Sequence, residues 1–146
     1  MEKLPQQPGI HYVSGAADIG TFTLSIPKEI ETKSDLPMVI SLHYAGSGIR
    51  YYGAGLLGDV VEPALRDLGA IMVAPDCQAG VWNNKKSEDQ IMALLELILS
   101  SYNIDPARLL ITGYSIGGIG PGTSPDGTRS GSPSQSQWRQ KRQHPY

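Results

Sequence analysis

LLITGYSIGGIG, residues 109–120, is the stretch that decides the fold of this chain. Its first five residues, LLITG, are a mostly apolar run that predicts a buried strand. The last residue of this run, Gly113, also begins GYSIG, which fits the G-x-S-x-G pattern. In that pattern the serine sits on a sharp turn between a strand and a helix, so its hydroxyl projects above the sheet. Ser115 is therefore predicted to be a nucleophile, and the amide of Ile116 is predicted to face a carbonyl oxygen that becomes negative. An ordinary glycine-rich turn between a strand and a helix is the alternative.

The segments before this stretch alternate between strand-like and helix-like patterns. Some carry alternating or continuous apolar residues, and two carry apolar residues at helical spacing. Strands are predicted at residues 20–27, 37–44, 70–76 and 109–113, and helices at residues 56–68 and 87–102. The order strand, helix, strand, helix, strand predicts parallel pairing through right-handed crossovers. The predicted fold class is α/β, a three-layer sandwich with a mostly parallel sheet.

A few residues mark the ends of the two predicted helices. Pro63 either kinks the first helix or lies in its first turn, because proline disrupts a helix interior. Gly69 is placed to end that helix. Ser87 is predicted to begin the second helix, with Gln90 three residues later completing a capping box.

Composition excludes several classes of function. The chain has 146 residues and a formal net charge of −2, which suits one domain and lacks the basic face that binds nucleic acids. No apolar run approaches the roughly 20 residues of a membrane span, and the first ten residues show no secretory signal. Cys77 is the single cysteine, and no metal-ligand spacing or cofactor motif is present. These features predict a cytoplasmic protein without a metal or cofactor, and they leave its oligomeric state open.

Several residues near the ends of the predicted strands are candidates for the same site. The loop HYAG, residues 43–46, follows the second strand, where a loop supplies a second amide to a developing negative oxygen. We interpret His43 as structural, because the catalytic base follows the nucleophile in this architecture. Trp82, Tyr51 and Tyr52 lie in loops near the carboxyl edge, where they either border a substrate or serve in packing or at the surface. Asp76, at the end of a strand, is interpreted as a turn former.

Three segments carry a resemblance to a known family. They are LPMVISLHYAGSG (36–48), GAIMVAPD (69–76) and IDPARLLITGYSIGG (104–118). In this order and at this spacing, residues 20–120 resemble bacterial esterases of the α/β-hydrolase superfamily. In particular, they resemble the predicted phospholipases, feruloyl esterases and polyhydroxybutyrate depolymerases. The family usually has glycine where Tyr44 stands, so the chain departs from the pattern there.

The resemblance implies a site and a reaction. Ser115 would be the nucleophile of acyl transfer through an acyl-enzyme, and the amides of Ile116 and of Ala45 or Tyr44 would form the oxyanion hole. A carboxylate and a histidine would follow on later strands, the substrate would be a small-molecule ester, and no cofactor would take part. The predicted function is that of a serine carboxylester hydrolase. A non-catalytic hydrolase-like binding module and a serine peptidase of the same fold are the alternatives.

The composition changes abruptly after residue 120. Residues 121–146 contain no Leu, Ile, Val, Met, Phe or Ala, so they have little apolar surface to offset the entropy of ordering. After Ser115 the only acidic residue is Asp126 and the only histidine is His144. We therefore expect residues 1–120 to be the N-terminal part of an α/β-hydrolase domain and the rest a disordered or out-of-frame tail. We also expect this chain to be inactive, because the acid and histidine of the triad are absent.

The degenerate codons of residues 120–131, GPGTSPDGTRSG, permit a family-like helix one reading frame away. When reading starts at the third base of each codon, the degenerate codons permit the amino-acid sequence TWHLARRYPER. The shifted codon that follows permits Phe or Val. Hydrolases of this type continue after GGIG with a helix of the kind TW-x-LA-x-RYP-x-RF. We hypothesise that the tail is a frameshift product, and a natural disordered extension is the alternative. Without that helix, the strand at residues 109–112 keeps an exposed edge, which predicts poor solubility.

Overall fold

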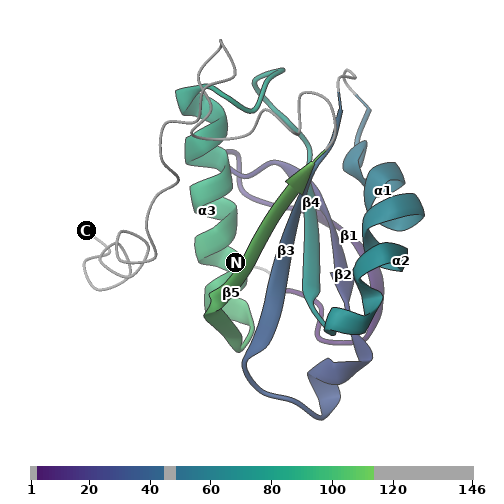
Figure 1. Cartoon of the computed structure of the whole chain (residues 1–146). Helices are drawn as coiled ribbons and strands as arrows, with labels where there is room; N and C mark the ends of the chain where they lie inside the picture. The colour runs from purple at the N-terminus through teal and green to yellow at the C-terminus, as the bar shows by residue number, and fades with distance from the viewer. Residues whose placement is uncertain (1–2, 45–48, 114–146) are drawn as a thin grey trace.

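The computed structural model describes residues 3–44 and 49–113, which form one sheet with helices on both faces (Figure 1). The strands are β1 (Gly9–Ser14), β2 (Thr21–Ile26), β3 (Leu36–Leu42), β4 (Ile71–Pro75) and β5 (Ile104–Gly113). The helices are α1 (Gly53–Leu56), α2 (Glu62–Leu65) and α3 (Lys85–Ser101). Strands β2, β3 and β4 match their predicted segments, and β5 begins at Ile104, five residues before the predicted start at residue 109. Strand β1 was not predicted.

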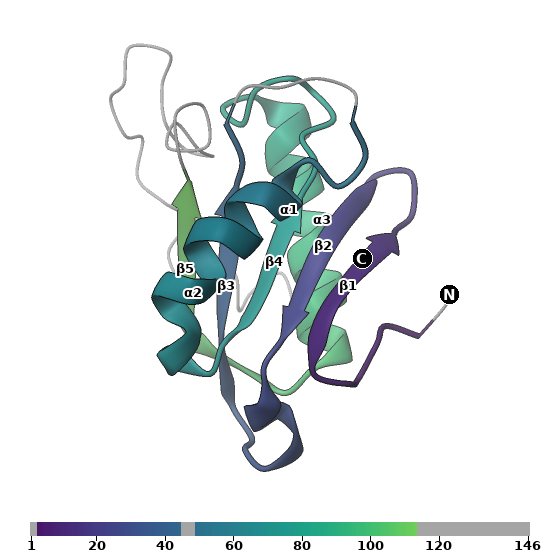
Figure 2. The ribbon, with the colours of Figure 1, turned by 90° about the vertical axis from the view of Figure 1, so that its right-hand side faces the viewer.

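The strands of the described residues lie in the order β1-β2-β4-β3-β5. Strand β3 pairs in parallel with β4 and with β5, as the alternation of strands and helices predicted. Strand β2 pairs antiparallel with β1 and with β4. Helix α3 covers one face of the sheet, and α1 and α2 cover the other (Figures 1 and 2). The predicted three-layer α/β sandwich is confirmed, and its parallel part consists of β3, β4 and β5.

Apolar side chains fill the spaces between the layers. Successive strand residues point to opposite faces, so each central strand contributes to two clusters. The cluster beneath α3 includes Phe22, Leu24, Met38, Ile40, Ile71, Val73, Ile91, Leu94, Leu95 and Ile98. The cluster beneath α1 consists of Val39, Leu57, Val61, Ala70, Met72 and Ala74. Full burial of one large apolar side chain contributes about 1.5–3 kcal/mol, so these two clusters hold the helices on the sheet.

Residues 53–68 form one continuous helical run rather than two helices separated at Pro63. Helix α1 passes into a π-helical turn at Leu57–Val61, then into α2, and ends in a short 3₁₀ turn at Arg66–Leu68. Pro63 lies in the first turn of α2, directly after the π turn. A proline ring clashes with the carbonyl four residues earlier, and the wider π turn makes room for it. Gly69 ends the run with a φ of 61°, as predicted.

The predicted capping box at the start of α3 is wrong. The helix begins at Lys85, and the side chain of Asn84 caps it by accepting a hydrogen bond from the Ser87 N–H at 2.9 Å. Ser87 lies one turn inside the helix, where its hydroxyl donates to the carbonyl of Val81. The amide of Gln90 turns into the protein interior instead of toward the helix start. Within the described residues, no helix combines the length and apolar character needed to cross a bilayer.

Tyr102, directly after α3, makes the stability of the fold vary with pH in the alkaline range. Its hydroxyl donates a hydrogen bond to the Pro5 carbonyl at 2.6 Å, and burial raises the pKa of Tyr102 to about 12 from its ordinary value of 10. As the pH rises, the phenol ionises in the unfolded chain at a lower pH than in the folded chain. The buried neutral phenol therefore makes its full contribution to the stability of the fold below about pH 10. That contribution is lost as the pH rises through about 12.

We expect the urea midpoint to fall more steeply with pH in the original chain than in Tyr102→Phe, which lacks the titrating group. Unfolding curves at pH 8, 10 and 11.5 measure this difference, and the Phe variant controls for the other tyrosines. Equal pH slopes for the two proteins would contradict the prediction.

Candidate active site

The carboxyl ends of β3, β4 and β5 lie at the same edge of the sheet (Figure 1). In open α/β sheets, ligands bind outside this edge. Leu42 at the end of β3 pairs with Gly113 at the end of β5, so the chain leaves both strands at neighbouring points. The predicted nucleophile and oxyanion residues Ser115, Ile116 and Ala45 lie outside the described residues.

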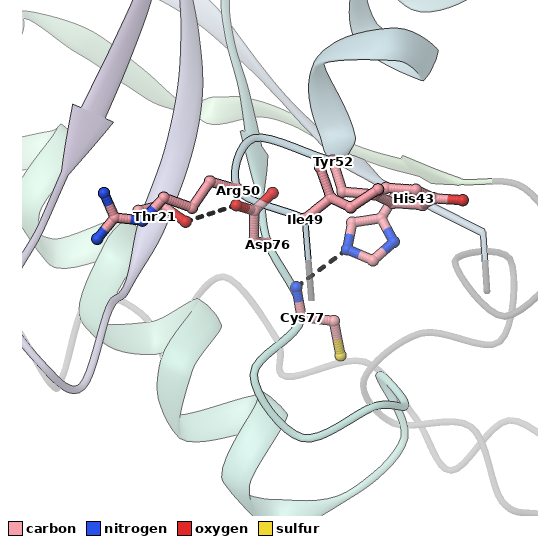
Figure 3. A pocket seen from close by; sticks show the side chains of 7 residues that line it. All are labelled: Thr21, His43, Ile49, Arg50, Tyr52, Asp76 and Cys77. Carbon is pink, nitrogen blue, oxygen red and sulfur yellow. Dashed lines mark hydrogen bonds between the residues drawn. The ribbon is translucent and has the colours of Figure 1, made fainter. Parts of the chain in front are cut away.

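A cavity of about 180 Å³ opens at this edge (Figure 3). Its walls come from the ends of β3 and β4, from the start of β2 and from the segment that leads into α1. The lining residues are Thr21, His43, Ile49, Arg50, Tyr52, Asp76 and Cys77. Pockets for drug-sized ligands are typically about 300–1,000 Å³, so this cavity suits a small group or one part of a larger ligand.

His43 is held as a neutral imidazole by two backbone groups. Its Nε2 lies 3.0 Å from the N–H of Cys77, which can only donate, so Nε2 accepts and carries no proton. Its Nδ1 lies 2.7 Å from the carbonyl of Tyr44, which can only accept, so Nδ1 carries the proton. Both ring nitrogens are occupied and the side chain is buried. This geometry agrees with a structural histidine and not with a general base.

Trp82 packs beneath His43. The indole has 0% exposure, and its Nε1–H donates a hydrogen bond to the His43 carbonyl at 3.1 Å. The indole and imidazole rings also meet edge to face, with centroids 5.3 Å apart. The substrate-binding role predicted for Trp82 stays a prediction, and the contacts in this structure are those of a packing residue that supports His43.

The two adjacent tyrosines near the cavity have different neighbours. Tyr52 lines the cavity, whereas Tyr51 contacts the ring of Tyr12 on β1, with centroids 5.0 Å apart. Tyr44 follows β3 directly, is 39% exposed, and packs its ring against that of Tyr52 at 5.6 Å. The sequence alone does not distinguish which of two adjacent tyrosines faces a cavity, and the structure places Tyr52 there.

Asp76 was interpreted as a turn former, but its carboxylate joins three segments. It accepts hydrogen bonds from the Thr21 hydroxyl at 2.5 Å, from the Tyr51 N–H at 2.6 Å and from the Gly53 N–H at 3.3 Å. The dashed line between Thr21 and Asp76 in Figure 3 marks the first of these bonds, and the one at His43 marks the bond from the Cys77 N–H. The one signal in the sequence was the place of an acidic residue directly after a buried strand at the carboxyl edge.

Gln90 connects α3 to the same edge. Its buried side-chain amide donates to the carbonyls of Ile19 at 2.9 Å and of Asp76 at 2.6 Å. Its side-chain oxygen accepts from the Gln78 N–H at 3.3 Å. Buried amides need such partners, and here the partners come from two segments beside the cavity, one before β2 and one directly after β4. Among the described residues, no three His, Cys, Asp or Glu side chains gather in a way that could hold a metal ion.

Comparison with solved structures identifies esterases with a similar fold. A thermostable esterase is 26% identical, with a TM-score of 0.56 over 76% of this chain and 35% of its own length. A thermophilic carboxylesterase cloned from a metagenomic library is 17% identical, with a TM-score of 0.52 over 80% of this chain and 40% of its own. An S-formylglutathione hydrolase from Agrobacterium tumefaciens is 19% identical, with a TM-score of 0.52 over 77% of this chain and 50% of its own.

Searches with protein-family models and among curated proteins find no match to this chain. The chain spans half or less of the length of each of these three solved enzymes. Over about three quarters of its length, its fold is nonetheless that of known esterases. The predicted resemblance to esterases of the α/β-hydrolase type is therefore confirmed.

Proposed function

We propose that the chain carries the first half of the active site of a serine carboxylester hydrolase. In the complete site, the hydroxyl of Ser115 attacks an ester carbonyl, and a histidine that follows the nucleophile in the sequence takes its proton. The backbone amides of Ile116 and of Ala45 or Tyr44 stabilise the oxyanion. The alcohol then leaves, and water releases the acid from the acyl-enzyme.

The observation that carries this proposal is the pairing of Leu42 with Gly113. Because β3 and β5 are adjacent and parallel, the loop after Leu42 and the turn after Gly113 start side by side at the edge where such sheets bind ligands. Acyl transfer requires such closeness, since the nucleophile and the oxyanion donors must reach the same carbonyl group. The size of the cavity beside His43 and Tyr52 supports a small-molecule ester as the substrate. A small group of that ester would enter the cavity.

The chain itself is proposed to be inactive. A serine hydroxyl is a weak nucleophile without an adjacent base, and only Asp126 and His144 follow Ser115 as candidates for the triad. Residues 121–146 are proposed to be out of frame, because the degenerate codons of residues 120–131 permit a family-like helix in another frame. Insertion of one base into the codon of Gly120 would then restore the hydrolase frame, and we call its product the frame-restored protein. A cytoplasmic location is part of the proposal, supported by the single free cysteine.

A non-catalytic binding module and a serine peptidase of the same fold are the other candidates. Assays on p-nitrophenyl butyrate and on a peptide p-nitroanilide separate the candidates when applied to the frame-restored protein. An esterase cleaves the ester far faster than the peptide, a peptidase cleaves the peptide, and a binding module cleaves neither. Ester cleavage that is lost in Ser115→Ala supports the proposal, and either of the other results contradicts it.

We expect the 146-residue chain to show no ester cleavage above that of its own Ser115→Ala variant. It should also associate in solution, because Leu110 and Ile111 on the last strand of the described sheet are 44% and 46% exposed. Size-exclusion chromatography followed by the ester assay measures both properties. A monodisperse preparation with turnover that depends on Ser115 would refute this expectation.

A further inference from the structure

The carboxylate of Asp76 binds the backbone that leads into α1. Its Oδ2 accepts from the Tyr51 N–H at 2.6 Å and from the Thr21 hydroxyl at 2.5 Å, and its Oδ1 accepts from the Gly53 N–H at 3.3 Å. Tyr51 has a φ of 59°, in the left-handed region that residues other than glycine rarely adopt. The carboxylate therefore stabilises a turn that the local chain does not favour by itself.

The bonds of Asp76 reach far along the sequence. Tyr51 and Gly53 precede Asp76 by 25 and 23 residues, and Thr21 precedes it by 55 residues. A residue that only ended β4 would bond to its own turn. Asp76 is itself held in place, because its N–H donates to the Thr21 carbonyl at 3.0 Å and its carbonyl accepts from Gln90.

Tyr52, between the two bound amides, connects Asp76 to the predicted oxyanion loop. The Tyr52 ring lies 5.1 Å from the ring of His43 and 5.6 Å from the ring of Tyr44, edge to face in both cases. Edge-to-face pairs are attractive and depend on relative position. Displacement of Tyr52 would remove one of the supports of Tyr44, whose amide is among the predicted oxyanion donors.

We propose that Asp76 is a positioning residue that fixes the backbone from Tyr51 to Gly53 and, through the ring of Tyr52, the place of Tyr44. Its consequence for catalysis rests on the proposed function, whereas the anchoring itself is a property of the folded chain. Asp76 does not touch the reacting atoms. Its effect on the reaction is to hold the wall of the cavity and the start of the oxyanion loop in one arrangement.

Backbone amide hydrogen exchange in the full 146-residue chain tests the anchoring. In Asp76→Ala, the amides of Tyr51 and Gly53 are expected to exchange about tenfold faster or more, because both lose their acceptor. In Asp76→Asn, the remaining oxygen serves Tyr51 and Thr21, so only the amide of Gly53 is expected to accelerate. The ring contacts of Tyr52 with Tyr44 and His43, followed by nuclear Overhauser effects, should weaken in Asp76→Ala. Asp59→Ala, an exposed acidic residue on the same helical run, is the control and should change none of these readouts.

The pattern of exchange separates positioning from general stabilisation. If the amides of β4 and α3 accelerate as much as those of Tyr51 and Gly53, Asp76 is merely structural and the proposal is wrong. Unchanged exchange at Tyr51 and Gly53 in Asp76→Ala would also overturn it. If Asp76→Ala does not fold, the selective effect at Gly53 in Asp76→Asn decides the matter.

The catalytic consequence is measured in the frame-restored protein. Asp76→Asn is expected to lower kcat roughly tenfold to 100-fold, while KM stays within about twofold, because misplacement affects the transition state most. An unchanged kcat would overturn the positioning role. If the frame-restored protein shows no esterase activity before any substitution, the proposed function fails, and the exchange pattern still decides the anchoring by Asp76.

Discussion

Insertion of one base into the codon of Gly120 is expected to convert an inactive chain into an esterase. The inserted base restores the frame that permits TWHLARRYPER directly after Gly120, and the hydrolase sequence should continue from there to a carboxylate and a histidine. Removal of a triad member typically costs on the order of 10⁴-fold or more in kcat. The frame-restored protein should therefore exceed the 146-residue chain by at least about that factor.

Initial rates with p-nitrophenyl butyrate measure the difference between the two proteins. Ser115→Ala in the frame-restored protein is the control and should return the rate to that of the 146-residue chain. A stop codon in the restored frame before any histidine would rule out the frameshift. The tail would then be a natural extension, and the binding module would become the leading candidate.

Replacement of Trp82 by alanine is expected to destabilise the fold more than any other single truncation near the cavity. The indole is fully buried in the cluster beneath α3, and its N–H satisfies the carbonyl of His43. Truncation of a buried tryptophan costs about 3–5 kcal/mol, out of a total stability that is typically about 5–15 kcal/mol. Trp82→Phe retains most of the packing and loses the hydrogen bond, so we expect a smaller loss of about 1–2 kcal/mol.

Urea unfolding followed by circular dichroism measures both Trp82 variants. Val81→Ala is a suitable control, because Val81 is adjacent in sequence and partly exposed. The change in its free energy of unfolding should stay within about 0.5 kcal/mol. A loss below about 1 kcal/mol for Trp82→Ala would show that the indole does not hold this edge of the sheet together.

The parallel part of the fold was predictable because its patterns are strong. The apolar runs of β3, β4 and β5 alternate with amphipathic helical segments, and this order permits few topologies. Strand β1 escaped prediction because Ile10, Tyr12 and Val13 do not alternate, and the strand depends on pairing with β2. An edge strand with both exposed and partly buried residues has no clear signal of its own.

The start of α3 was mispredicted because a tertiary contact decided it. The residues from Ser87 to Gln90 fit a capping box, but the carbonyls of Ile19 and Asp76 bind the Gln90 amide instead. Asn84, three residues before Ser87, then caps the helix. Two caps compete within one turn of sequence here, and no local pattern records which of them has a distant partner.

The strand ends of the candidate site were predictable, but the network behind them was not. His43 bonds to the backbone of Cys77, 34 residues away, and Trp82 bonds to His43 across 39 residues. The same holds for Asp76 and Tyr51, 25 residues apart. Such contacts depend on how three loops meet at the carboxyl edge, which a single sequence does not encode in any local pattern.

Labelling of Ser115 by a fluorophosphonate, located by mass spectrometry, tests the central claim most directly. Such a reagent forms a covalent adduct only with a serine that a working triad activates. We predict an adduct on Ser115 in the frame-restored protein and none in the 146-residue chain under the same conditions. An unlabelled Ser115 in a folded frame-restored protein, or an adduct on another residue, would contradict the assignment of this site as that of a serine esterase.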